Sequence, residues 1–176
     1  GRAIGLTGAF LFRLGEYQQA MDNCEKSMQI LEEARPHIAY AHTLIYAGAS
    51  AFGLGDFDRV VSYWQMGAKE YQTVGSKWGE TTSNANLAEA MVALGNLKNG
   101  KVHAEYALVL AREMNNPEMI GAALTNLASI AMLDENFIEA TKFAEEALSS
   151  HQQVGHDAHI ANALAVLAKI AFKQNN

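Results

Sequence analysis

The sequence predicts an all-α solenoid of four stacked helical hairpins followed by one unpaired C-terminal helix. Three observations lead to this fold class: a turn signal that recurs every 40 residues, apolar residues spaced three and four apart, and the lack of the alternation typical of strands. The turn signal is a short polar stretch, a large apolar residue and, three positions later, a small one. Its four copies begin at Gly15, Gly55, Gly95 and Glu135.

Each copy is expected to form two helices, one on either side of the turn signal, because the helical period of apolar residues continues on both sides. One such hairpin cannot bury its apolar faces alone, so neighbouring hairpins must stack. The expected helix pairs are 1–14 with 17–34, 37–54 with 57–74, 78–94 with 97–114, and 117–134 with 137–154, followed by a single helix at 157–173.

Helix ends are marked by residues with special backbone preferences. The two prolines, Pro36 and Pro117, lie between units, where a proline can start a helix without breaking one. Asn116 is expected to cap the helix that begins at Pro117, and Asp157 to do the same one unit later. Gly or Asn at the end of a helix suits a left-handed cap, and three residues share that position: Gly75, Asn115 and Gly155.

Small residues predict where the two helices of a hairpin cross, because small side chains allow the helix axes to approach closely. In the first helices they are Gly8, Gly48, Ala88, Ala128 and Ala168, and in the second helices Ala20, Val60, Gly100 and Ala140. The fourth copy has Asp134-Glu135 where the others have Leu-Gly, so a looser turn is expected there.

These residues resemble the tetratricopeptide repeat, whose pattern is a leucine and a small residue, then Gly-x-aromatic-x-x-small, then an Ala-Leu pair. The matching pairs are Leu87-Ala88, Leu127-Ala128, Leu167-Ala168, Ala107-Leu108 and Ala147-Leu148. The period of 40 rather than about 34 resembles the repeats of bacterial signal-transduction ATPases, maltose-activator-type regulators and peptide-binding polarity adaptors. The resemblance implies a right-handed superhelix whose concave face is lined by the first helices.

Composition limits the classes of partner. The net charge of −6 disfavours a nucleic-acid-binding surface, which needs a basic stripe. No apolar stretch is long enough to span a membrane, and no signal segment is recognisable. The single cysteine, Cys24, suits a reducing compartment, so a cytoplasmic location is expected.

The chain is expected to be one solenoid, with repeats at 1–36, 37–76, 77–116 and 117–156 and a half repeat at 157–176. The first helix is apolar over most of its circumference, whereas terminal repeats usually present a polar outer face. We therefore expect the sequence to be a segment of a larger protein.

The concave face that the resemblance implies contains the candidate binding residues. Asn86 and Asn126 occupy the same position in adjacent repeats, and an amide side chain can donate to and accept from a peptide backbone at once. The alternative is that they hydrogen-bond neighbouring helices or cap a polar groove. The other candidates on this face are Phe12, His42, Tyr46, Phe52, Glu89 and Met132. In the chaperone-docking members of the family, a set of residues clamps a C-terminal carboxylate, and only Asn86 matches that set here. Binding of a chaperone tail is therefore disfavoured.

No motif of an enzyme is present: there is no phosphate-binding glycine loop, nucleophile elbow or nucleophile with an evident base. No cofactor is predicted. His151, His156 and His159 gather around Asp157 and could bind zinc, but a solvated loop with a capping aspartate is favoured because no metal-site spacing is matched.

The repeat also predicts where the cysteine and the two tryptophans lie. Cys24 and Trp64 share one position and are expected to be core residues. Trp78 lies at an inter-unit turn, where it either packs on the helix start or marks a contact patch.

The sequence therefore predicts a non-catalytic module that binds a protein or peptide segment, including one from the same polypeptide. The alternative is a ligand-sensing or autoregulatory segment of a larger bacterial signalling protein or transcriptional regulator. Direct nucleic-acid or membrane binding is not expected. The sequence leaves the oligomeric state open.

Overall fold

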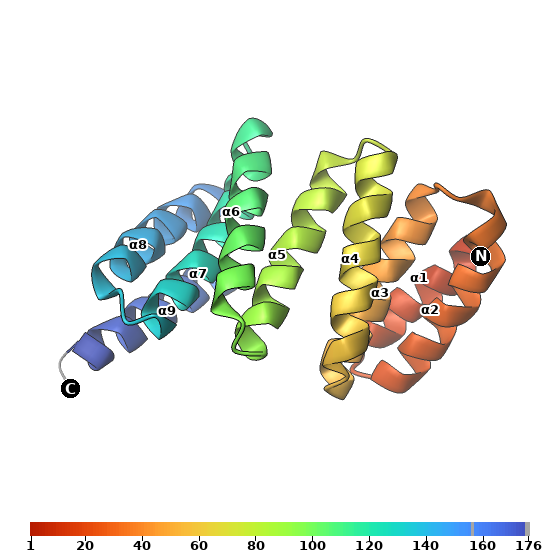
Figure 1. Ribbon diagram of the computed structural model, residues 1–176, viewed down its shortest axis with the longest axis horizontal. Coiled ribbons are helices and arrows are strands. Elements are labelled where there is room, and N and C mark those ends of the chain that lie inside the picture. The colour runs from red at the N-terminus through yellow and green to blue at the C-terminus, as the bar shows by residue number, and fades with distance from the viewer. Residues whose placement is uncertain (156, 175–176) are drawn as a thin grey trace. The chain divides into compact units, whose positions relative to one another are not determined.

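The computed structural model describes residues 1–155 and 157–174, and every regular element within these ranges is a helix (Figure 1). The chain divides into two compact units, Gly1–Ala90 and Met91–Asn176. Each is described by itself.

In the first unit, the helices follow one another as antiparallel hairpins joined by short turns. Its helices are α1 (Arg2–Arg13), α2 (Tyr17–Leu31), the 3-10 helix η1 (Glu32–Ala34), α3 (Ile38–Leu54), α4 (Phe57–Thr73) and most of α5 (Lys77–Ala93). α1 packs on α2, α3 packs on α4, and α3 also packs on both α1 and α2. The stack predicted from the repeat is thus formed within this unit.

In the second unit, the same arrangement recurs. Its helices are the end of α5, α6 (Leu97–Glu113), α7 (Pro117–Leu133), α8 (Phe137–Val154) and α9 (Asp157–Gln174). α7 and α8 form the hairpin, α6 packs on α7, and α9 packs on α8 and α7.

The predicted helices are confirmed within the described ranges, and the largest shift is at the end of α2. A single helix was expected over 17–34, but the α-helix ends at Leu31 and a 3-10 turn follows. Arg35 is then extended, with φ −71° and ψ 149°. The physical reason is Pro36, which disfavours helical geometry at the residue before it.

Asn116 caps α7 as predicted: its side chain accepts from the amide of Met119 at 3.2 Å, and Pro117 occupies the first turn. The prediction for Asp157 is wrong, because Asp157 is the first residue of α9 rather than its cap. In that first turn its carboxylate lies where the helix dipole favours negative charge. α3 begins two residues after Pro36, and the His37 side chain caps it by accepting from Ala39 N at 2.9 Å.

The predicted left-handed helix ends are confirmed, with positive φ at Gly75, Asn115 and Gly155. The looser turn expected in the fourth copy is seen in one hydrogen bond and not in the backbone conformation. The amide of Glu135 donates to the carbonyl of Met132 at 3.3 Å, whereas the equivalent bond from Gly95 to Val92 measures 3.0 Å. Glu135 adopts φ 59°, in the same region as Gly95 at φ 72°. The amide of Asn136 donates to the carbonyl of Ala131 at 2.8 Å, the same length as the equivalent bond after Gly95. The turn geometry is kept although a side chain replaces glycine.

Small residues lie at the helix crossings as predicted. A Cβ on Gly8 would lie 2.7 Å from the Cys24 sulfur, so these helices meet at a distance that glycine allows. Cys24 is fully buried and Trp64 is 3% exposed, which confirms both as core residues. Ala168 is the exception: it is exposed, because α9 packs on α8 and α7 through other residues.

Candidate functional site

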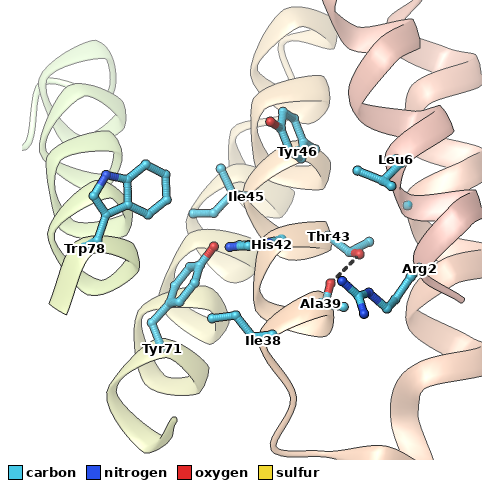
Figure 2. Close-up of a pocket in the computed structure, with 11 residues that line it drawn as sticks. Arg2, Leu6, Ile38, Ala39, His42, Thr43, Ile45, Tyr46, Tyr71 and Trp78 are labelled. Atoms are coloured by element: carbon cyan, nitrogen blue, oxygen red, sulfur yellow. Dashed lines mark hydrogen bonds between the residues drawn. The ribbon is translucent and has the colours of Figure 1, made fainter. Parts of the chain in front are cut away.

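A cavity of about 260 Å³ lies over α3 in the first unit, flanked by α1 on one side and by α4 and α5 on the other (Figure 2). We call it the α3 pocket. Its walls are mainly aliphatic and aromatic, with a few polar groups. It is lined by Arg2, Gly5 and Leu6 of α1, Ile38, Ala39, His42, Thr43, Ile45 and Tyr46 of α3, Tyr71 of α4 and Trp78 of α5.

The charge in the α3 pocket is positive. The lining contains no carboxylate, and Arg2 is its one permanently charged residue among those described. Arg2 forms no ion pair with any residue in 1–155 or 157–174. Desolvation, together with the charge of Arg2, lowers the pKa of His42 below its usual 6.5. The imidazole is therefore neutral at pH 7 and can both donate and accept a hydrogen bond.

Tyr71 places a buried polar atom at the inner wall. The residue is 0% exposed, and within the described part of the chain its hydroxyl has no hydrogen-bond partner. Figure 2 shows this hydroxyl directed toward His42, and the two ring centroids are 5.7 Å apart. Desolvation raises the pKa of Tyr71 well above its usual value, so the hydroxyl stays protonated and remains a donor.

The position of Tyr71 is fixed by close contact with the next helix. A Cβ on Gly79 of α5 would lie 2.0 Å from the Tyr71 ring, so the ring lies directly against the α5 backbone. Thr43, in contrast, is already satisfied, because it donates to Ala39 O at 2.8 Å (Figure 2). Tyr71 is thus the lining residue with an unused buried hydroxyl.

The structure brings three of the predicted binding residues together. His42 and Tyr46 both line the α3 pocket, and the Phe12 ring packs against Tyr46 at 6.3 Å between centroids. Phe52 lies elsewhere. Its ring stacks on Trp64 at 6.1 Å and meets Phe57 edge-on at 5.5 Å, so it packs between α3 and α4.

The remaining candidates are distributed over both units. Asn86 is half-buried and Glu89 exposed on α5 in the first unit. Asn126 and Met132 are half-buried on α7 in the second unit, where Met132 packs against the core cluster around Ala131 and Ile170.

Ala9, which lies on α1 with Phe12, is 8% exposed and belongs to the core. The reason is its size, since a methyl side chain fits between packed helices.

The sequence did not identify Tyr71 as a site residue, because it lies on a second helix, which the resemblance assigns to the other face. The available signal was Gly79, a glycine inside a helix, which often marks a close approach. For Trp78 the sequence allows either packing on the helix start or a contact patch. It is 53% exposed and lines the α3 pocket, so it belongs to the site.

A solvated loop was expected around His151, His156 and His159, and this is wrong for His151. His151 is 2% exposed and stacks on His159 with centroids 5.0 Å apart. A Cβ on Gly121 would lie 2.4 Å from the His151 ring, which shows how closely α7 covers it. His156 lies outside the described residues. Among the described ones, no group of three or more His, Cys, Asp or Glu is placed to bind a metal.

Comparisons with known proteins identify the repeat and the fold. Residues 121–154 match the tetratricopeptide repeat family model. No curated protein matches the chain at a significant level. Within the described residues, no helix has both the length and the apolarity needed to cross a membrane.

Three solved structures share the fold at low sequence identity. BtubC from P. vanneervenii is 15% identical, with a TM-score of 0.81, and the match covers 95% of this chain and 70% of BtubC. A Rap protein in complex with competence and sporulation factor is 17% identical, with a TM-score of 0.84 and coverage of 98% and 48%. The nearly identical TPR-like repeats of a Podosopora anserina kinesin light chain are 14% identical, with a TM-score of 0.80 and coverage of 99% and 86%.

The chain spans about half the length of the Rap protein, 48%. Its helices are arranged as in these structures, although the sequences share few identities. The fold is therefore that of a TPR-like α-solenoid, and the matched repeat at 121–154 supports the tetratricopeptide repeat family for this chain.

Proposed function

We propose that this chain is a non-catalytic interaction module that binds an extended segment of a partner protein along its first helices, the concave face that the family resemblance implies. The observation that carries the proposal is the TPR-like fold combined with a first-helix surface of aromatic and amide side chains. The 40-residue form of the repeat and a cytoplasmic location are part of the same proposal.

The fold supports this function by analogy. The Rap protein that shares the fold was solved in complex with a competence and sporulation factor. Because the identity is only 17%, the likeness supports the class of function and does not identify the partner.

The chemistry of the first helices supports a peptide rather than a nucleic acid. Asn86 and Asn126 are both half-buried, so each retains exposed surface beside packed helices. An amide can pair with the donor and the acceptor of one peptide unit, which favours capture of an extended chain with little dependence on its sequence. The net charge of −6 disfavours a phosphate backbone as the alternative.

The test is a selection of random 12-residue peptides on the immobilised chain, followed by fluorescence anisotropy of the recovered peptides. Asn86→Ala and Asn126→Ala are measured singly and together, because the proposal assigns peptide contact to both amides. Each substitution is expected to weaken binding by about 3- to 10-fold, the usual value of a hydrogen-bonded amide.

The matched control is Asn99→Ala, which removes the same side chain from an exposed position on a second helix, α6. It should leave the peptide affinity unchanged. Unchanged binding in the double variant would remove the asparagines from the mechanism. Failure to recover any saturably binding peptide would contradict the interaction module itself.

A second candidate is a ligand-sensing or autoregulatory segment of a larger bacterial signalling protein or regulator. It is supported by the α3 pocket and by the likeness to Rap and RapI, of which the chain covers 48% each. The discriminating experiment introduces Asn86→Ala into the parent polypeptide. A change in the activity or DNA binding of an attached domain would support autoregulation, whereas unchanged output would leave external partner binding as the better account.

A further inference from the structure

The α3 pocket has the size of a small ligand rather than of a cofactor. Its volume of about 260 Å³ exceeds the roughly 150 Å³ that suffices for benzene in an apolar cavity. It is slightly smaller than the roughly 300 to 1,000 Å³ typical of sites for drug-sized molecules. One aromatic ring with a short substituent therefore fits the available space.

The walls of the α3 pocket favour an aromatic group. Leu6, Ile38 and Ile45 supply aliphatic surface, and Tyr46 and Trp78 supply ring surface. Trp78 is 53% exposed, so a ring bound beside it would bury apolar surface that is now in contact with water. An aromatic ligand gains both this burial and the preferred edge or offset contacts between rings.

The charge of the α3 pocket selects an anion. Arg2 has no carboxylate partner among the described residues, and the lining adds no negative charge that would repel an acid. A guanidinium binds a carboxylate through two parallel hydrogen bonds, which fixes orientation as well as sign.

The buried hydroxyl of Tyr71 selects a further polar group on the ring. It has no partner among the described residues, and an unpaired buried hydroxyl is unfavourable until it is satisfied. Figure 2 shows it beside His42, which is exposed, so the imidazole can turn aside and admit a ligand atom. A ring hydroxyl can accept from Tyr71 and donate to the neutral imidazole of His42.

We propose that the α3 pocket binds a small aromatic carboxylate that carries a ring hydroxyl, such as a hydroxyphenylalkanoate. Arg2 pairs with the carboxylate, the ring lies against Ile45 and Trp78, and Tyr71 and His42 bind the hydroxyl. This site goes beyond peptide binding by the first helices, and it does not require Asn86 or Asn126.

The test is isothermal titration calorimetry of the chain with 4-hydroxyphenylacetate. Two further ligands dissect the site: 4-hydroxyphenylacetamide lacks the charge, and phenylacetate lacks the hydroxyl. We expect saturable one-to-one binding of the hydroxy acid. The amide should bind about tenfold or more weakly, in line with the strength of a charge-assisted hydrogen bond.

Two arginines of α1 provide a matched pair of variants. Arg2→Gln removes the cation of the pocket, whereas Arg13→Gln makes the same change of net charge at an exposed residue outside the lining. Arg2→Gln should weaken binding of 4-hydroxyphenylacetate about tenfold and abolish its higher affinity relative to the amide. Arg13→Gln should change neither value. Equal effects of the two variants would show that the preference for the acid over the amide comes from the net charge of the chain, which would overturn the site.

Tyr71→Phe tests the hydroxyl with little change of shape. It should remove the advantage of 4-hydroxyphenylacetate over phenylacetate and leave phenylacetate binding unchanged. The ligand comparison on the unaltered chain needs no variant to fold. Absence of saturable binding there, or equal binding of acid and amide, overturns the proposal. Binding only by peptides bearing an aromatic and an acidic residue would also overturn it, while leaving the interaction module intact.

Discussion

A Cβ atom on Gly48 would lie 2.3 Å from the indole nitrogen of Trp64, a distance that no real side chain tolerates. The same indole donates to the carbonyl of Ile45 at 3.1 Å. The N–H edge of Trp64 thus lies directly against the backbone of α3, and this contact sets how closely α3 and α4 pack.

Gly48→Ala is expected to destabilise the fold by up to about 2 kcal/mol. Alanine gains about 1 kcal/mol of helix propensity, but the added methyl forces Trp64 out of its position, and such overpacking costs about 1 to 3 kcal/mol. Urea unfolding followed by circular dichroism measures the difference. Gly67→Ala is the control, because its Cβ would meet no atom closer than 3.4 Å. It should be neutral or stabilising; a loss equal to that of Gly48→Ala would show that the close contact is not the cause.

Glu135→Gly is expected to stabilise the chain by about 0.5 to 1 kcal/mol. Glu135 has φ 59°, where a side chain costs roughly 1 to 2 kcal/mol. Glycine removes this cost, but it loses more conformational freedom on folding, which offsets part of the stabilisation. Thermal unfolding measures the effect. The converse substitution, Gly95→Glu in the equivalent turn, should destabilise by a similar amount, and a stabilising Gly95→Glu would contradict the argument.

Cys24 is expected to resist thiol reagents while the chain is folded. Burial raises the pKa of the Cys24 thiol to about 12, with a smaller contribution from the charge of Glu25. Since the thiolate is the reactive form, Ellman's reagent at pH 8 should react slowly in buffer and fully in urea. Fast reaction of the folded chain would place Cys24 at an accessible surface.

The same pKa predicts a loss of stability in alkaline solution. The folded thiol keeps its proton up to about pH 12, whereas the unfolded thiol loses it near pH 9. Its contribution is therefore fully present below pH 9 and decreases as the pH rises toward 12. Unfolding of the chain and of Cys24→Ala across this range tests the sign, because the pH dependence should be shallower in the variant.

Arg35→Met is expected to destabilise the first unit by about 2 to 3 kcal/mol. Arg35 donates to Glu70 Oε1 from Nε at 2.8 Å and also from Nη2. The Glu70 side chain is 8% exposed, so the substitution leaves a buried carboxylate without its cation. Breaking a buried pair costs about 3 to 5 kcal/mol, which is reduced here because Arg35 is 34% exposed.

A double-variant cycle separates the pair from the packing of the arginine. Arg35→Met with Glu70→Met should be more stable than Arg35→Met alone, because no buried charge is left unpaired. If Arg35→Met costs as much in the Glu70→Met background, the loss comes from packing, for example over the Tyr40 ring, which lies 4.7 Å below the guanidinium.

The local structure followed from local signals. Asn116 caps α7 and Gly155 ends α8 because a side-chain acceptor or a positive φ acts on the neighbouring turn and needs no distant contact. The crossing at Gly48 could be predicted because the constant period allows residues at the same position of each repeat to be compared. The turn at Glu135 keeps its backbone conformation because its hydrogen bonding outweighs the preference of one residue.

The sequence alone determined the helices, their hairpins and the small residues at their crossings. Only the tertiary structure decided which side chains meet across those hairpins. Arg2 is far from Tyr71 and Trp78 in the chain, and the three line one pocket because α1, α4 and α5 all flank α3. His151 is buried for a similar reason, since α7 covers a side chain that was expected to be solvated. Such contacts depend on the packing of whole helices, and a repeat period does not encode the side chains that fill each interface.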